Sequence, residues 1–232
     1  MSTIAELWRY PVKSMLGEQC EALCLESRGV VGDRQYAIRD AFGKLGSGKN
    51  TRRFRKIDGL LAFSARYSGD VPELFFPSGG MMRGDAPALN ESLSATLGQH
   101  VMLSKESDIS HLDAGPVHLI TSASLHWLQA ALPDEMITAR RFRPNIVIQW
   151  PGAERVEERW IGKEIRLGRE VRLLINAQTE RCGMVAFAQG ALPEQPGILR
   201  KISQLADLKF GIYAQVITPG IVRVGDEVSL HA

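Results

Sequence analysis

Residues 213–230, which read YAQVITPGIVRVGDEVSL, decide the fold class of this chain. Three short apolar runs, 213–217, 221–224 and 227–230, are separated by the pairs Pro219-Gly220 and Gly225-Asp226. Proline–glycine and glycine–aspartate pairs favour turns, and short runs rich in β-branched residues favour strands. The stretch therefore predicts three consecutive short strands joined by tight turns.

The same pattern of short strands extends through the rest of the chain. Further strands are predicted at 4–10, 21–25, 34–39, 60–67, 73–76, 101–103, 117–120, 146–149, 164–167 and 171–177. Because long helices do not alternate regularly with these strands, a doubly wound parallel sheet is disfavoured. We expect a fold that is mainly β with some α, built around barrel-like sheets.

Three helices are predicted among these strands. Asn90 is expected to cap a helix that ends at Gly98, and Thr121-Ser122 to cap one that runs to about residue 132. A third helix, 197–206, would carry an apolar stripe of Ile198, Ile202 and Leu205. The polar segment 104–115 is the best candidate for a linker, which divides the chain into domains 1–103 and 104–232.

Composition limits the class of protein. The chain has 232 residues, of which 44% are hydrophobic and 23% charged, as in ordinary globular domains. Its net charge of +2 gives no reason to expect nucleic-acid binding, and the one dense basic run, 51–56, is read as a solvated loop or, less often, an anion-facing patch. The N-terminus carries no secretory signal pattern and no apolar run reaches membrane-spanning length, so we expect a cytoplasmic protein that binds no membrane.

The cysteines and histidines predict neither a disulfide framework nor a zinc site. There are three cysteines, an odd number, and unbridged cysteines are typical of a reducing cytosol. The five histidines form no pair at zinc-ligand spacing with one another or with the cysteines. His111 and Asp113 could support other residues of a site, but the expected place for this pair is a solvated loop.

Cys182 is the best candidate for a reactive residue. It follows the predicted strand 171–177 and stands beside Arg181. A thiolate can bind a soft metal or act as a nucleophile, whereas the plainer interpretation is a buried cysteine near a surface arginine. Four distant clusters offer donors to an anion that could lie beside this sulfur. They contain Lys13, Ser14, Arg34, Thr121, Ser122, Arg143 and Asn145.

Each of these donors also has a structural interpretation. Lys13 and Arg34 could be ordinary surface charges, and Thr121 or Ser122 could do no more than cap a helix. Arg143 could simply pair with Glu154 or another carboxylate. Pro144 is expected to hold Arg143 out of right-handed helical geometry. Only convergence of the clusters on Cys182 would favour an anion site.

Seven segments, taken in order, resemble a known family. They are residues 10–15 (YPVKSM), 32–34 (GDR), 119–125 (LITSASL), 142–148 (FRPNIVI), 181–182 (RC), 210–214 (FGIYA) and 219–228 (PGIVRVGDEV). Together they resemble the MOSC-domain family, named after the C-terminal part of the molybdenum cofactor sulfurase. The likeness is greatest to two-part members such as the mitochondrial amidoxime-reducing component and its bacterial relatives.

The resemblance implies a β-barrel-rich MOSC domain preceded by a smaller MOSC N-terminal β-barrel domain. It also implies a molybdenum–molybdopterin cofactor with Cys182 as the protein's ligand to the metal and as the catalytic residue. The cofactor would be held by Lys13, Ser14, Arg34, Thr121, Ser122, Arg143, Asn145 and Arg181. At the level of the family, pyridoxal phosphate binding is a further association.

The function implied by the resemblance is reduction of N-hydroxylated small molecules, with electrons from a separate electron-transfer protein. Two alternatives stay open. Cys182 could carry sulfur as a persulfide, in a sulfur carrier or transferase, or the chain could bind and deliver the cofactor without catalysis. Residues 184–190 (MVAFAQG) are shorter and uncharged where the amidoxime-reducing relatives carry an acidic, proline-containing stretch.

Overall fold

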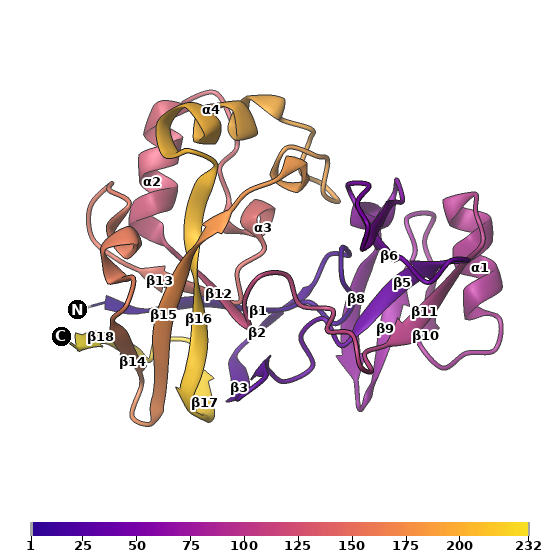
Figure 1. Ribbon diagram of the computed structural model, residues 1–232, viewed down its shortest axis with the longest axis horizontal. Coiled ribbons are helices and arrows are strands. Elements are labelled where there is room, and N and C mark those ends of the chain that lie inside the picture. Colours follow the sequence, from indigo (N-terminus) through magenta and orange to yellow (C-terminus); the bar gives the residue numbers. More distant parts are fainter. Residues whose placement is uncertain (1, 232) are drawn as a thin grey trace.

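A closed barrel of seven strands forms the larger lobe of the computed structural model, which describes residues 2–231 (Figure 1). Only β12 and β13 pair in parallel, and every other neighbouring pair in the barrel is antiparallel. Around the barrel the strands follow the order β1 (Ser2–Arg9), β13 (Ile146–Gln149), β12 (Val117–Thr121), β16 (Lys209–Thr218), β15 (Val171–Glu180), β14 (Glu164–Leu167) and β18 (Glu227–His231). A short strand, β2 (Glu18–Cys20), pairs antiparallel with residues 7–9 at the end of β1.

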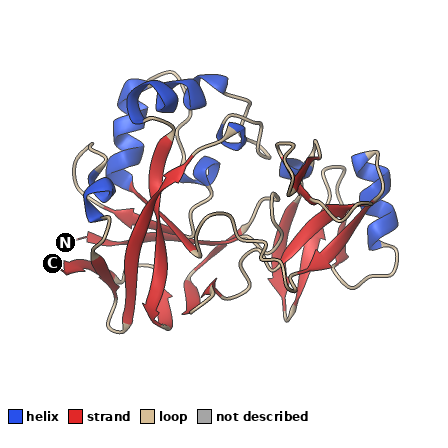
Figure 2. Cartoon of the chain, viewed as in Figure 1, coloured by secondary structure: helices blue, strands red, loops and turns tan. Residues whose placement is uncertain are grey.

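Successive side chains along a barrel strand point alternately into the barrel and out toward the helices, so the larger lobe has one apolar core inside the barrel and another beneath the helices. Leu119 points into the barrel interior, whereas its neighbour Ile120 belongs to a second cluster under the helices. Strand β12 is therefore buried on both faces, as expected for a strand covered by helices. The covering helices are α2 (Ser122–Ala131), α3 (Ala139–Phe142) and α4 (Pro196–Ala206), with the 3₁₀ turn η2 (Val156–Trp160) beside them (Figure 2).

The smaller lobe packs two sheets around its own core. One sheet has the order β11 (Val101–Lys105), β5 (Tyr36–Asp40), β6 (Leu45–Ser47) and β7 (Phe54–Lys56). The other has the order β10 (Met81–Arg83), β9 (Val71–Phe75) and β8 (Ser64–Ser68). Helix α1 (Leu89–Leu97) and the 3₁₀ turn η1 (Leu60–Ala62) complete the lobe. The mainly β fold that the sequence predicts is confirmed.

The two lobes are tied together by the N-terminal segment. Strand β1 closes the barrel although it comes first in the chain, and β3 (Ala22–Glu26) pairs with β17 (Gly220–Arg223) and β4 (Gly29–Val30). The division into domains 1–103 and 104–232 stays a prediction, and the structure adds that its first strand belongs to the barrel. Segment 106–116 crosses between the lobes as an irregular chain that is exposed at residues 107–110, as expected of a linker, whereas His111 within it is buried.

Several predicted elements are found with the bounds that the sequence indicates, and three details are wrong. Strands 146–149 and 164–167 are confirmed, as is the cap at Thr121. Residues 60–62 form a 3₁₀ turn instead of strand, because Gly59 has a left-handed φ of 88° and Leu60 and Leu61 both turn inward. Helix α1 begins before Asn90, whose side chain instead accepts a hydrogen bond from the Leu103 amide (2.9 Å).

The third correction concerns the apolar stripe of α4. Ile198 and Ile202 are fully buried, but Leu205 is 51% exposed and Ala206 takes its place against the barrel. Among residues 2–231, no helix is long and apolar enough to cross a lipid bilayer.

The two faces of α4 predict different losses of stability. Ile202→Ala is expected to lower the free energy of unfolding by about 2–5 kcal/mol, because it removes buried methylenes and leaves a cavity. Leu205→Ala is expected to change it by less than about 1 kcal/mol, since the side chain is half exposed and alanine favours helix. Chemical denaturation of both variants checks this, and equal losses would contradict the placement of α4.

Candidate functional site

Cys182 lies two residues beyond the end of β15, where the chain enters the 3₁₀ turn η3 (Gly183–Val185). Strand β15 runs to Glu180, three residues farther than the sequence predicts, so Gln178 and Glu180 reach the same region. The cysteine is half-buried and forms no disulfide. Its side chain opens on a cavity between the two lobes.

This cavity, called the cationic cavity below, has a volume of about 440 Å³ and is strongly positive. Its lining contains two carboxylates, those of Asp113 and Glu180. It contains six cationic side chains: Lys13, Arg34, Lys49, Arg53, Arg143 and Arg181. A hollow lined by an excess of one charge attracts the opposite charge, so the cavity is suited to an anion.

Three residues of its lining hold an unusual backbone conformation. Ser14, Arg34 and Arg143 have φ values of 64°, 51° and 56°, in the left-handed region that residues with a side chain rarely adopt. Pro144 after Arg143 keeps it out of right-handed helix, as the sequence predicts. Such conformations persist where the surrounding structure imposes them, and they concentrate at binding sites.

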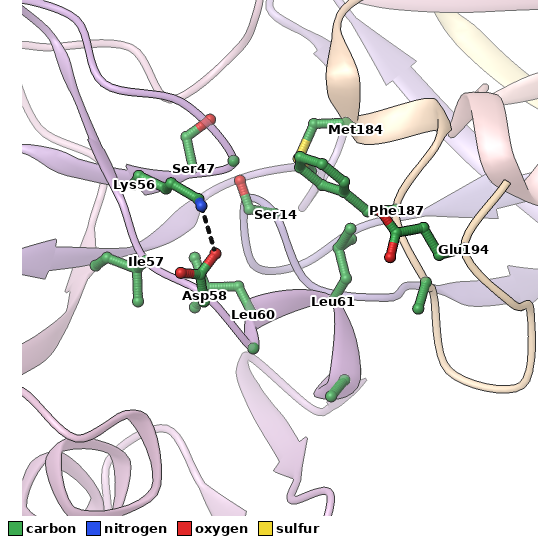
Figure 3. Close-up of a pocket in the computed structure, with 14 residues that line it drawn as sticks. Ser14, Ser47, Lys56, Ile57, Asp58, Leu60, Leu61, Met184, Phe187 and Glu194 are labelled. Carbon is green, nitrogen blue, oxygen red and sulfur yellow. Dashed lines mark ion pairs between the residues drawn. The ribbon is translucent and has the colours of Figure 1, made fainter. Parts of the chain in front are cut away.

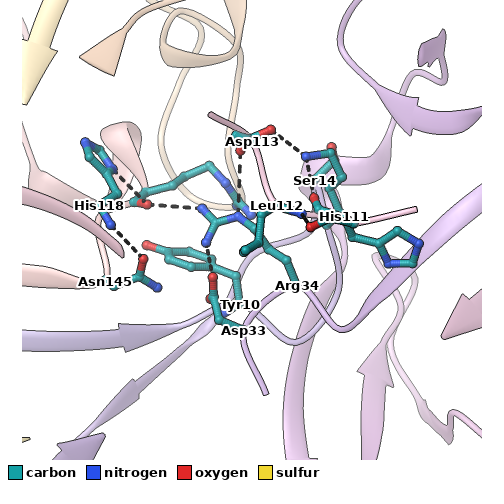
Figure 4. A network of polar contacts seen from close by, with 12 residues as sticks. Tyr10, Ser14, Asp33, Arg34, His111, Leu112, Asp113, His118 and Asn145 are labelled. Carbon is teal, nitrogen blue, oxygen red and sulfur yellow. Dashed lines mark hydrogen bonds and ion pairs between the residues drawn. The ribbon is translucent and has the colours of Figure 1, made fainter. Parts of the chain in front are cut away.

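A network of polar contacts links the buried Lys13 and Arg34 to Asp113, whose side chain is half exposed (Figure 4). The Lys13 ammonium donates to Asp113 and to the His111 carbonyl (2.9 Å), and the Arg34 Nε lies 3.7 Å from the Asp113 carboxylate. Desolvation raises the pKa of Asp113, but the charges of Lys13 and Arg34 outweigh it and hold that pKa well below its usual range. Desolvation also lowers the pKa of Lys13, against the opposing effect of Asp113. One carboxylate thus offsets part of two buried positive charges.

Tyr10 provides an aromatic surface for two guanidinium groups. The Arg34 and Arg143 guanidinium carbons lie 4.9 and 4.3 Å from the centre of its ring. Arg34 also pairs with the buried Asp33, which accepts a hydrogen bond from the Tyr10 amide (2.8 Å). Burial, and then the charge of Arg34, lower the pKa of Arg143 to about 10, which leaves it protonated at neutral pH.

Arg143 keeps part of its hydrogen-bonding capacity free. Its Nη1 donates to the Met15 carbonyl (2.6 Å), whereas its Nη2 is buried without a hydrogen-bond partner among the described residues. It forms no ion pair within residues 2–231, so the alternative of a plain salt bridge with Glu154 finds no support. A buried N–H without a partner is costly unless a ligand accepts from it.

His118 and Arg181 form the wall beside Cys182. The Nδ1 atom of His118 lies 3.3 Å from the Arg143 carbonyl, and its Nε2 lies 3.4 Å from an Arg181 Nη1. Desolvation and then the charge of Arg181 hold the pKa of His118 well below its usual range, so the ring is neutral. Arg181 donates to the Phe142 carbonyl (2.8 Å), and its Nε is a second buried donor without a partner among residues 2–231.

The loop that follows Cys182 is fixed from behind by Arg141. This side chain is fully buried, and it donates to the carbonyls of Phe187 (3.4 Å) and Pro193 (2.8 Å) and to the side chain of Gln195. Gln189 reaches back to the carbonyls of Arg141 (3.2 Å) and Met184 (2.9 Å). The cysteine is therefore placed on a rigid turn.

Three predicted cofactor-binding residues do not line the cationic cavity. Thr121 accepts from the Ser124 amide and donates to Glu157 (2.7 Å), so it caps α2. Ser122 donates to the Trp150 carbonyl (3.0 Å). Asn145 accepts from the His118 amide (3.1 Å) and donates to the Trp8 carbonyl (3.3 Å), which ties the start of β13 to its two neighbours, β12 and β1. The lining contains the other predicted residues: Lys13, Ser14, Arg34, Arg143, Arg181 and Cys182.

Residues 106–229 match the MOSC domain, and residues 1–74 match the MOSC N-terminal beta barrel domain. The chain belongs to the MOSC domain family. A curated relative is the mouse (Mus musculus) mitochondrial amidoxime-reducing component 1, which is 24% identical over 99% of this chain and 82% of its own length.

Two solved structures show the same fold. The YUAD protein from Bacillus subtilis has a TM-score of 0.57 at 16% identity, over 100% of this chain and 97% of its own. A hypothetical protein of known crystal structure has a TM-score of 0.51 at 11% identity, over 100% of this chain and 68% of its own. The MOSC domain family is linked to the molybdenum cofactor, and the relative named above is a component of an amidoxime-reducing enzyme.

Sequence reasoning missed several residues of this MOSC cavity. Asp113 does lie in an exposed loop, but the sequence does not reveal that its carboxylate faces Lys13 and Arg34. His118 carries no motif because it is a single histidine inside an apolar strand. Arg53 and Phe54, from the basic run 51–56, line the cavity. Part of that run is therefore an anion-facing patch, the second of the two interpretations that the sequence allows. In the sequence, the high density of basic residues in this run is the one feature that points to Arg53 and Phe54.

The neutral histidines predict a pH-dependent stability. The pKa of His111 is lowered to about 4, first by desolvation and then by Arg39, whereas in the unfolded chain it is near 6.5. Between those values the unfolded state binds more protons, so stability is lost as pH falls from about 6.5 to about 4. His111→Gln should reduce this loss, by at most about 3 kcal/mol, in thermal unfolding measured across the range. The same pH dependence in both proteins would contradict a neutral His111.

Proposed function

We infer that this chain binds a molybdenum cofactor in the cationic cavity, with the Cys182 thiolate as ligand to the metal, and reduces N-hydroxylated small molecules. One observation carries the proposal: six cationic side chains and two unpartnered buried guanidinium N–H groups surround a single half-buried thiol. An uncharged ligand would leave those charges uncompensated, whereas a phosphorylated cofactor would offset them.

The donor set fits this group. Within the described residues, no cluster of three or more histidine, cysteine, aspartate or glutamate side chains could hold a metal ion. The cationic cavity thus offers one thiolate, which suits a metal whose other ligands come from an organic cofactor. The Nη2 of Arg143 and the Nε of Arg181 would donate to the anionic groups of the cofactor, and Lys13 and Arg34 would balance its remaining charge.

The bound cofactor would supply two-electron oxygen-atom transfer chemistry. The overall reaction takes an N-hydroxylated compound, two electrons and two protons; the N–O bond breaks and the oxygen leaves as water. The chain's part is to bind and orient. His118 keeps Arg181 in place by accepting from it, and Arg141 keeps the cysteine turn from moving. Thr121, Ser122 and Asn145 would act through the strands and helix that they fix.

The electrons would come from a separate electron-transfer protein. Lys49, Arg52 and Arg53 are exposed on the loop between β6 and β7, and Lys56 is exposed at the end of β7. Lys49 and Arg53 also line the cationic cavity. A positive surface at the mouth of a site favours a partner with a negative one, mainly by raising the association rate. We therefore propose an acidic partner that docks on residues 49–56.

Metal analysis tests the main proposal. Protein produced in a host that makes molybdopterin is expected to carry molybdenum and to reduce an amidoxime with a chemical electron donor. Cys182→Ala should lose most of the metal and at least about 99% of the activity, because the thiolate ligand is gone. The matched control is Cys24→Ala, which removes an exposed cysteine and should change neither property.

Two results would overturn the proposal. Wild-type protein without molybdenum, or a Cys182→Ala variant that keeps full metal and activity, contradicts it. A sulfane adduct on Cys182, detected by mass spectrometry after incubation with a cysteine desulfurase and without bound molybdenum, would favour a sulfur carrier instead.

Docking of an acidic donor predicts a salt-dependent rate. With a small acidic electron-transfer protein as donor, Arg52→Glu should raise its KM about fivefold or more, and added salt should have a similar effect. The control, Arg169→Glu, makes the same charge change on the exposed turn between β14 and β15 and should stay within twofold. A chemical donor should show neither effect. Equal responses of the two variants would place the docking surface elsewhere.

A further inference from the structure

A second cavity adjoins the cationic cavity. It has a volume of about 410 Å³, and Ser14, Ser47 and Met184 line both hollows, so the two are neighbours along these residues (Figure 3). This second hollow, called the apolar cavity below, lies between η1 of the smaller lobe and the turn that carries Cys182.

The chemistry of the apolar cavity is opposite to that of its neighbour. One wall comes from the smaller lobe and contains Ile57, Leu60 and Leu61, and the other contains Met184, Phe187 and Ala188. Among the lining residues the cation is Lys56, which is paired with Asp58 (3.3 Å). The exposed side chains of Asp58 and Glu194 also belong to the lining, one from each lobe.

The walls are already in place. Gly48 touches the opposite wall: a Cβ atom there would lie 2.6 Å from the Phe187 ring and 2.8 Å from the Met184 sulfur. Behind the wall, Arg141 donates to the carbonyls of Val185 (3.5 Å) and Phe187 (3.4 Å). The Gly190 amide donates to the Leu61 carbonyl (3.2 Å), which ties one wall to the other. A preformed apolar hollow with few polar groups is typical of a small-molecule site.

We propose that the apolar cavity binds the aromatic or similarly bulky apolar group of a neutral N-hydroxylated substrate. This rests on the proposed function, which gives the cationic cavity to the cofactor and leaves the substrate to the adjoining hollow. The N–O end of the substrate would point past Met184 toward the Cys182 side, and its apolar group would pack on Phe187 and Leu61. Carboxylate-bearing compounds would be disfavoured, because Lys56 is already paired with Asp58 and Glu194 repels them.

Two amidoximes with the same reactive end test this. Benzamidoxime carries an aromatic ring and acetamidoxime a methyl group, so they differ in the group that the apolar cavity would bind. Their dissociation constants are measured by ligand-observed NMR on molybdenum-loaded protein without an electron donor. Benzamidoxime should bind at least about tenfold more tightly, since burial of an aromatic ring is favourable. A carboxylate on the ring should remove most of that gain.

Variants locate the effect. Phe187→Ala removes the aromatic wall, Ala62→Trp fills the hollow from an exposed position, and Phe187→Tyr keeps the wall. The first two should reduce the preference for benzamidoxime to about twofold or less, and the third should retain it. The control is Phe42→Ala, which truncates a phenylalanine that is 82% exposed and should leave both affinities unchanged. Unfolding temperatures confirm that each variant is folded.

The outcomes separate this inference from the proposed function. Equal binding of the two compounds by the wild type, or a preference that survives both Phe187→Ala and Ala62→Trp, overturns the apolar site even if amidoximes are reduced. A preference lost in those two variants, in protein that reduces neither compound, supports the site and overturns the proposed reduction. Where reduction occurs, Phe187→Ala should raise KM for benzamidoxime about tenfold and leave KM for acetamidoxime within twofold.

Discussion

Burial of like charges is the constraint on which this structure depends. Lys13, Arg34 and Arg143 are all less than 10% exposed and face one hollow, and charges removed from water repel strongly. Asp33 and Asp113 offset Arg34 and Lys13, and the face of the Tyr10 ring lies against Arg34 and Arg143. Arg143 and Arg181 still have unpartnered donors among the residues described. The protein is therefore built to hold charge that an anion would complete.

The fold brings these charges together because the chain passes between the two lobes more than once. Strand β1 closes the barrel and leads directly into Tyr10, Lys13 and Ser14, so the first cationic residues are fixed to the barrel and to the smaller lobe at once. Segment 106–116 returns between the lobes and brings Asp113 to Lys13. Left-handed conformations at Ser14, Arg34 and Arg143 turn three loops sharply where they meet. The cationic cavity lies where these loops meet.

The sequence predicts the barrel better than it predicts the cavity. The apolar pattern marks both strands correctly: 164–167 alternates because one face lies in a core, and 146–149 is a continuous apolar run because both of its faces are buried. The lining residues Lys13, Arg34, Arg143 and Arg181 stand out as cations within two residues of a proline, glycine or cysteine.

Residues that act through tertiary contacts are harder to predict. Asp113 lies in a polar stretch that resembles any exposed loop, and only the fold shows that it faces Lys13 and Arg34. Thr121, Ser122 and Asn145 are polar residues in the right motifs, yet their hydrogen bonds go to the backbone and to Glu157. A polar residue looks the same in sequence whether it faces a ligand or a helix end.

One short turn joins the two hollows: Cys182 lies on the cationic side, Phe187 on the apolar side, and Met184 touches both. Five residues of chain, anchored by Arg141, thus fix how far a group bound at the thiol lies from one bound at the phenylalanine. Side chains at 187 and 188 can therefore change the apolar wall while the cations around Cys182 stay where the barrel holds them.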